Sequence, residues 1–254
     1  MNTLSLRRRS RLALALITLI SLITLLSPPS AFAQEAAIRK SLAERLPQLP
    51  KIDEVTKSPI PGLYEVRFGG NQILYADATG EYVFVNGSLI EVKTRSDLTE
   101  ARIERLSAID FDTLPLKDAI VFTQGTGARK VAVFVDPNCG YCKRFERDLA
   151  TVRDVTVYTF LMPILGPDST TKSRDIWCAR DSAKSWRAWM LDNVAPPKSA
   201  ASCDSAVLDR NLEFSKKHRI NATPALVFED GMRRTGAMKV EQIDLMLAAA
   251  RGKR

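Results

Sequence analysis

Along residues 36–92, the apolar positions predict one helix followed by a small antiparallel sheet. Ile38, Leu42 and Leu46 recur at helical spacing, and two prolines after them end the pattern. Turn sequences, of which Asn86-Gly87 has the strongest hairpin preference, then separate four strand-like runs. These runs cover residues 63–68, 72–75, 81–85 and 88–92. A unit of this size buries little apolar surface alone, so pairing with a second copy would stabilise it.

Residues 94–108 are highly charged and only weakly amphipathic. Leu98, Ile103 and Leu106 recur between acidic and basic residues, which is typical of a solvated connecting helix. Asp97 stands three residues before Glu100, the spacing of a capping box at a helix start. The pattern leaves two possibilities open: a helix packed on one domain, or a free-standing spacer between two domains.

From Leu114 onward, strand and helix patterns alternate, which predicts an α/β domain with a mixed sheet. The strand runs are short and apolar, whereas the helical runs carry apolar residues three and four positions apart. The predicted strands are 119–122, 130–135, 155–160, 224–228 and 232–235. The predicted helices are 139–152, 169–191, 204–218 and 240–250.

The amino terminus has the features of a secretory signal peptide. A basic start is followed by an apolar stretch over residues 12–26 and by Ala31-Phe32-Ala33, a small-x-small cleavage site. We therefore expect residues 1–33 to be removed, leaving an exported protein in an oxidising compartment, without stable membrane association. An uncleaved anchor is the alternative, but the apolar stretch is shorter than the roughly 20 residues of a membrane span. Arg8-Arg9 leaves both the general and the twin-arginine export routes open.

Composition narrows the classes of function. With 45% hydrophobic and 26% charged residues, the 254-residue chain can form a packed core. The formal net charge is +8, and the four arginines of the predicted signal peptide supply half of this excess. The remaining charge is small for the chain length and argues against nucleic-acid binding. The only histidine is His218, which excludes His-rich metal sites and disfavours Ser-His-Asp or Cys-His hydrolases.

Cys139-Gly140-Tyr141-Cys142 carries the candidate chemistry. The motif follows an apolar strand and opens a helical pattern, so Cys139 is predicted at a helix N-terminus, where free N–H groups stabilise a thiolate. We predict that Cys139 is the exposed attacking thiol and Cys142 the buried resolving thiol. A zinc site would need a second Cys or His pair. A structural disulfide across two residues would restrict the unfolded chain little.

The other two cysteines, Cys178 and Cys203, have no metal-site spacing, and thiols rarely stay free in an oxidising compartment. We therefore predict a structural disulfide between them, although a second redox pair remains an alternative. In the chain-entropy model, closing a loop of about 25 residues contributes about 3–4 kcal/mol. Separately, Thr223-Pro224 directly precedes an apolar strand. A proline at such a position either opens an edge strand or has a cis peptide bond.

Four motifs together resemble the thioredoxin superfamily, and more closely the DsbC/DsbG family of periplasmic protein disulfide isomerases. Gly-Tyr between the cysteines and Thr before the proline are similar to the isomerase branch, whereas the oxidase branch has Pro-His and Val there. The resemblance covers nearly the whole mature chain. The motifs are residues 134–142, Ile176-Trp177-Cys178-Ala179, Ser202-Cys203-Asp204 and Thr223-Pro224-Ala225.

This resemblance implies three domains after the signal peptide. They are a cystatin-like dimerisation domain of one helix and an antiparallel sheet over residues 34–93, a linker helix over 94–112, and a thioredoxin-like catalytic domain with a helical insertion over 113–254. The buried acid that thioredoxin has six residues before its first cysteine is absent, because Val133 stands there. The sequence therefore does not identify the group that takes the proton of the buried cysteine.

The implied function is isomerisation or reduction of non-native disulfides in exported proteins. Cys139 and Cys142 would be catalytic, surrounded by Gly140, Tyr141, Thr223 and Pro224, with no cofactor beyond the redox-active pair. The implied partners are a second copy of the chain, misoxidised exported proteins, and a membrane thiol reductase of the DsbD type. Two alternatives stay open: a DsbA-type dithiol oxidase with the same site, and a chaperone-like holdase with little redox turnover.

Overall fold

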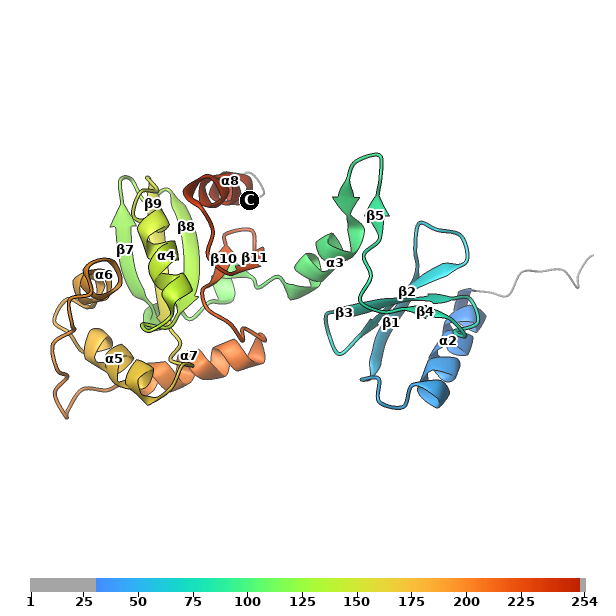
Figure 1. Cartoon of the computed structure of the whole chain (residues 1–254), viewed down its shortest axis with the longest axis horizontal. Coiled ribbons are helices and arrows are strands. Elements are labelled where there is room, and N and C mark those ends of the chain that lie inside the picture. The colour runs from blue at the N-terminus through green and yellow to red at the C-terminus, as the bar shows by residue number, and fades with distance from the viewer. Residues whose placement is uncertain (1–30, 252–254) are drawn as a thin grey trace, which may run out of the picture. The chain divides into compact units, whose positions relative to one another are not determined.

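A computed structural model describes residues 31–251 of the chain. The predicted signal peptide therefore lies almost entirely outside the described residues. The described residues form two compact units, which divide between Leu89 and Ile90 (Figure 1). Within residues 31–251, no helix combines the length and the apolar character that crossing a bilayer requires.

The first unit packs one helix against a four-stranded antiparallel sheet (Figure 1). Ile38 and Leu42, which form the predicted apolar face of the helix, are buried against Val66 and Leu74 of the sheet. The strands lie in chain order, β1-β2-β3-β4. The elements are α2 (Ala31–Arg45), β1 (Ile52–Lys57), β2 (Leu63–Phe68), β3 (Gln72–Asp77) and β4 (Val83–Phe84).

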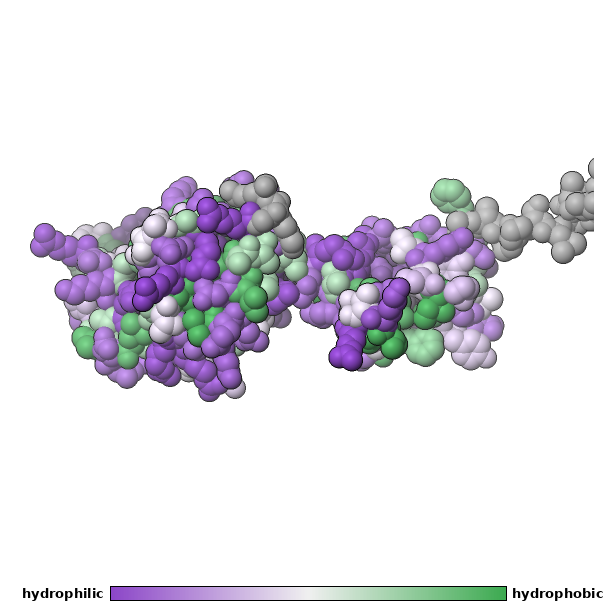
Figure 2. All heavy atoms as spheres, turned by 90° about the horizontal axis from the view of Figure 1, so that it is seen from above, coloured by the Kyte–Doolittle hydropathy of each residue, from purple (hydrophilic) through white to green (hydrophobic). Residues whose placement is uncertain are grey.

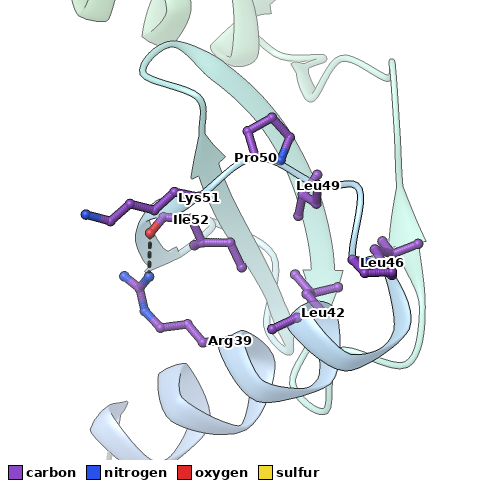
Figure 3. Close-up of a pocket in the computed structure, with 9 residues that line it drawn as sticks. Arg39, Leu42, Leu46, Leu49, Pro50, Lys51 and Ile52 are labelled. Carbon is purple, nitrogen blue, oxygen red and sulfur yellow. Dashed lines mark hydrogen bonds between the residues drawn. The ribbon is translucent and has the colours of Figure 1, made fainter.

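A cavity of about 400 Å³ lies where α2 ends and β1 begins (Figure 3). Leu42, Leu46 and Leu49 contribute apolar side chains to its lining. The guanidinium of Arg39 donates a hydrogen bond to the carbonyl of Ile52 at 2.7 Å. This bond ties the helix to the first strand.

Four features of this region differ from the prediction. The pattern misses β1, because charged residues separate its apolar residues Ile52 and Val55. The predicted strand 81–85 shrinks to the two residues of β4, and the predicted strand 88–92 does not join this sheet. Instead β5 (Ile90–Glu91) pairs with β6 (Ser96–Asp97) in the second unit. Asn86 has the positive φ of a turn residue, 58°, but no hairpin forms there, because β4 pairs only with β3.

The second unit contains the predicted mixed sheet (Figure 1). Its strand order is β11-β10-β8-β9-β7; β8 and β9 are parallel, and all other neighbours are antiparallel. The strands are β7 (Ile120–Gln124), β8 (Arg129–Val135), β9 (Val155–Leu161), β10 (Ala225–Phe228) and β11 (Arg233–Thr235). The helices are α3 (Leu98–Ser107), α4 (Gly140–Leu149), α5 (Pro167–Trp177), α6 (Ser182–Asp192), α7 (Ala206–Lys217) and α8 (Val240–Arg251).

Residues 131–135 of β8 are all buried, because both faces of the sheet are covered. Successive side chains of a strand point to opposite faces. Val131, Val133 and Val135 therefore share a core with residues of α4, α6 and α8. Ala132 and Phe134 pack in a second core, with residues of α7 and of the segment 109–114. The central strand is thus fixed from both sides before it reaches the Cys-Gly-Tyr-Cys motif.

The predicted helix 169–191 is two helices. Cys178 caps the end of α5, and α6 begins after Asp181, whose carboxylate accepts a hydrogen bond from the backbone N–H of Lys184 at 2.9 Å. An aspartate at this position satisfies a free N–H group of the new helix. The apolar spacing continues from α5 into α6, so the sequence pattern does not show that the helix is interrupted between them.

The connecting helix α3 is shorter than the predicted linker of residues 94–112. Its start is as predicted, since Asp97 accepts a hydrogen bond from the N–H of Glu100 at 2.8 Å. Near its end, Glu104 forms an ion pair with Arg234 at 2.7 Å, and just beyond it the N–H of Ile109 donates to the carbonyl of Gly231 at 3.0 Å. These contacts tie the end of the helix to the second unit.

Candidate redox site

Cys139 lies between the end of β8 and the first residue of α4. It is the N-cap residue of α4, with an extended backbone, and its Sγ accepts a hydrogen bond from the N–H of Cys142 at 3.4 Å. The first N–H groups of a helix have no partner within the helix and carry partial positive charge. The sulfur of Cys139 therefore lies at the partially positive end of α4, the position expected from the strand-to-helix pattern.

The two thiols differ in access. Cys142 is completely buried, and Cys139 keeps 6% of its surface exposed. The sequence predicts a freely exposed Cys139, and this is wrong, because the thiol of Cys139 lies against Thr223 and donates a hydrogen bond to its carbonyl at 3.4 Å. Gly140 and Tyr141 between the cysteines are exposed. A reacting disulfide therefore meets Gly140 and Tyr141 on the exposed surface next to Cys139.

Burial raises the pKa of the Cys142 thiol far above its ordinary value. Hydrogen bonds from the backbone of Asp136 and the side chain of Thr223 favour the thiolate, but they do not offset the loss of hydration. Cys142 therefore keeps its proton at neutral pH. It can act as a nucleophile only if a group takes this proton as it reacts.

Thr223-Pro224 forms a cis peptide bond. The strand that follows, β10, lies between β8 and β11, so the proline does not open an edge strand. Ala225 pairs with Phe134 of β8, and this register brings residues 223–224 to the end of β8 that leads into Cys139. Residues 84 positions apart in the chain, Cys139 and Thr223, meet in this way.

Asp136 holds the loops around the cysteines. Its buried carboxylate accepts hydrogen bonds from the N–H groups of Asn138, Ile164 and Leu165 at 2.7, 2.8 and 3.0 Å, and from the hydroxyl of Ser169 at 2.8 Å. A buried carboxylate with four donors is fully engaged. Asp136 therefore fixes the geometry of the loops around the cysteines.

The helix α6 supports the same loop. Trp189 donates its indole N–H to the carbonyl of Pro137 at 2.6 Å, and the ammonium of Lys143 lies 3.9 Å from the centre of its ring. Lys143 directly follows Cys142. These contacts hold the start of α4 in place, so that the positions of both thiols are set by packing from α6 as well as from the sheet.

Sequence reasoning missed Glu146, a buried carboxyl of α4 that accepts a hydrogen bond from the indole of Trp186 at 2.9 Å. Burial raises its pKa to about 7, while the Trp186 hydrogen bond and the charge of Arg187 act in the opposite direction. The signal in the sequence is spacing: Glu146 stands four residues after Cys142 and three before Leu149, on the apolar face of the helix.

The remaining two cysteines form a disulfide. Cys178 at the end of α5 is bonded to Cys203 in the loop before α7, with the Cα atoms 6.0 Å apart. Cys139 and Cys142 are the free thiols. Within residues 31–251, no group of three or more His, Cys, Asp or Glu side chains is arranged to bind a metal ion.

Comparison with known protein families matches both parts of the chain. Residues 29–100 match the N-terminal domain of disulfide bond isomerase proteins, and residues 116–251 match a thioredoxin-like domain. A crystal structure of the disulfide interchange protein from Neisseria gonorrhoeae is similar, with a TM-score of 0.52 and 36% identity, over 54% of this chain and 99% of that one.

Two sequence relatives agree with this result. The probable thiol:disulfide interchange protein DsbC of Bordetella pertussis is 42% identical over 84% of this chain and 74% of its own length. The thiol:disulfide interchange protein DsbC of Escherichia coli is 28% identical over 83% of this chain and 86% of its own. With a thioredoxin-like unit, a Cys-x-x-Cys at the start of α4 and these relatives, the chain belongs to the DsbC family of thiol:disulfide interchange proteins.

Proposed function

We propose that this protein is a periplasmic disulfide isomerase in which Cys139 attacks and Cys142 resolves. One observation carries the proposal: the sulfur of Cys139 caps α4 and retains some access to solvent, while Cys142 is completely buried behind it. This asymmetry supports different roles for the two thiols, since an incoming disulfide can meet only the first.

The reaction begins when the Cys139 thiolate attacks one sulfur of a non-native disulfide. The client disulfide breaks, a Cys139–client disulfide forms, and the second client sulfur leaves as a thiolate. In isomerisation, another client thiolate then attacks the mixed disulfide and releases Cys139 as a thiolate. In reduction, Cys142 attacks instead, so that the client leaves reduced and Cys139 and Cys142 become a disulfide.

The first route works only if Cys139 and Cys142 are kept reduced. A membrane thiol reductase of the DsbD type is the partner that would supply the electrons, and misoxidised exported proteins are the clients. Cleavage of residues 1–33 would deliver the protein to the periplasm. The Cys139–Cys142 pair is the whole redox centre of this proposal and needs no further cofactor.

The oxidation state in cells distinguishes this proposal from a dithiol oxidase. When acid-quenched cells are treated with a thiol-alkylating reagent of high mass, we expect two labels on most molecules, on Cys139 and Cys142, because the Cys178–Cys203 disulfide blocks the other two cysteines. Protein from a strain without the membrane reductase should lose both labels. An unlabelled protein in reductase-containing cells would contradict the isomerase and favour the oxidase.

A homodimer formed through residues 34–93 completes the proposal. β4 is the end strand of its sheet, and Tyr82, Phe84 and Val85 are each more than half exposed. An exposed edge strand with apolar side chains favours pairing with another chain. In Figure 2, apolar residues reach the surface among the hydrophilic ones. Two copies joined in this way would present two redox sites to one client.

A further inference from the structure

The helix that begins at the two active cysteines also carries a buried carboxyl group with no role in the steps above. Glu146 lies in the core of the second unit, where an ionised carboxylate loses its hydration. A buried acid costs stability unless it is paired or neutral, so such a residue is a candidate for function. At the same time, Cys142 needs a proton acceptor, and Val133 stands where thioredoxin has its acid.

Helical geometry brings these two groups together. Residues four apart on a helix lie on the same face, with Cβ atoms about 5–6 Å apart. Long side chains in a helix point back toward its N-terminus, over the preceding turn. Cys142 and Glu146 therefore lie one turn apart on the same face of α4, and both are buried.

The surroundings of this pair are mostly apolar; Cys139 acts on Cys142, and Arg187 acts on Glu146. The sheet below α4 contributes Val131, Val133 and Val135, and α8 contributes Ile243 and Leu247. From α6, Trp186 donates its indole hydrogen bond to Glu146, and Arg187 acts on it through its charge. Because its pKa is about 7, Glu146 is present in both protonation states near neutral pH, the condition for an effective general base.

We propose that Glu146 accepts the proton of Cys142 when Cys142 resolves the mixed disulfide. This inference rests on the proposed function, because it names the proton acceptor for the step in which Cys142 resolves the mixed disulfide.

In that step the Cys142 S–H bond breaks and the proton passes to the Glu146 carboxylate. The electron pair of the Cys142 sulfur forms a bond to Cys139, and the Cys139–client S–S bond breaks. The client sulfur leaves as a thiolate. Cys139 and Cys142 are thereby oxidised, the client is reduced by two electrons, and the Glu146 proton returns to solvent or to the client thiolate.

The test uses the reduced full-length protein and an aromatic disulfide whose released thiolate absorbs visible light. Attack by Cys139 releases one thiolate at a rate proportional to reagent concentration, and resolution by Cys142 releases a second at a rate independent of it. In the wild type, we expect the second rate to rise with pH, with an inflection near the pKa of Glu146. Glu146→Gln keeps a hydrogen-bond acceptor for Trp186 but removes the base.

In Glu146→Gln, the second rate should fall by about a hundredfold at neutral pH and lose its inflection, since a positioned base contributes about that factor or more. The first rate should stay within about twofold of the wild type. Asp148→Asn removes another carboxylate of the same helix and should leave both rates unchanged. A Glu146→Gln variant that keeps the rate and pH profile of the wild type would overturn the proposal.

Arg187→Gln provides a second test of the role of Glu146 that does not depend on whether Glu146→Gln folds. The change leaves the core intact. Removing this positive charge takes away an influence that lowers the pKa of Glu146, so the inflection of the second rate should move to higher pH. An unchanged inflection would contradict the role of Glu146. Absence of the first phase in the wild type would instead refute the attack by Cys139, so the two proposals fail in different ways.

Discussion

Replacing Cys142 by serine should trap client proteins on Cys139 as mixed disulfides, whereas replacing Cys139 by serine should trap none. Cys139 retains its position at the N-cap of α4 and its access to solvent, so the first attack still occurs. Without Cys142, the protein itself can no longer release the client. In Cys139→Ser, the remaining thiol is completely buried, and burial keeps it protonated.

The measurement is a non-reducing gel of periplasmic extract, prepared after acid quenching and probed for the protein. High-mass adducts should be abundant in Cys142→Ser, absent in Cys139→Ser, and lost when the sample is reduced. The Cys139→Ser, Cys142→Ser double variant is the control for adducts through other cysteines. Equal adducts from both single variants would show that the two thiols are not divided into attacker and resolver.

Replacing Phe84 by glutamate should convert the protein from a dimer into a monomer. Phe84 lies on the end strand β4 and is more than half exposed in the single chain, so the change is tolerated by the first unit itself. In the proposed dimer this side chain is covered, and a buried, unpaired carboxylate costs several kcal/mol. A loss of about 3 kcal/mol weakens association by more than a hundredfold.

Sedimentation of the full mature protein measures this effect. Ile60→Glu is the matched control, because Ile60 is an exposed apolar residue of the same unit that lies in the turn between β1 and β2. It should leave the dimer intact. A wild type that sediments as a monomer would rule out the dimer. A Phe84→Glu variant that remains a dimer would show that the interface does not include β4.

The parts of the fold that the sequence predicts well are those set by local pattern. The apolar run before Cys139 and the helical spacing after it place the cysteine at a helix start, and the structure has Cys139 as the N-cap of α4. The apolar face of α2 at Ile38 and Leu42 follows in the same way. In both cases the information lies within one or two helical turns of the residues concerned.

The parts that the sequence does not predict depend on contacts between distant segments. The cover over Cys139 comes from Thr223, and only the pairing of Ala225 with Phe134 brings that residue there. The separation of 88–92 from the first sheet depends on the partner that β5 finds in β6. The spacing places Glu146 on the apolar face of its helix, but the contact that covers it comes from Trp186 of α6. Tertiary packing decides each of these features.

The central claim is that the Cys139–Cys142 site rearranges non-native disulfides. It is tested most directly by the rate at which the purified, reduced protein restores activity to a secreted enzyme whose disulfides have been scrambled. The wild type should restore activity, Cys142→Ser should retain part of this rate because a client thiol can release Cys139, and Cys139→Ser should not exceed the rate without protein. Recovery of the scrambled enzyme by Cys139→Ser at the wild-type rate would contradict the account.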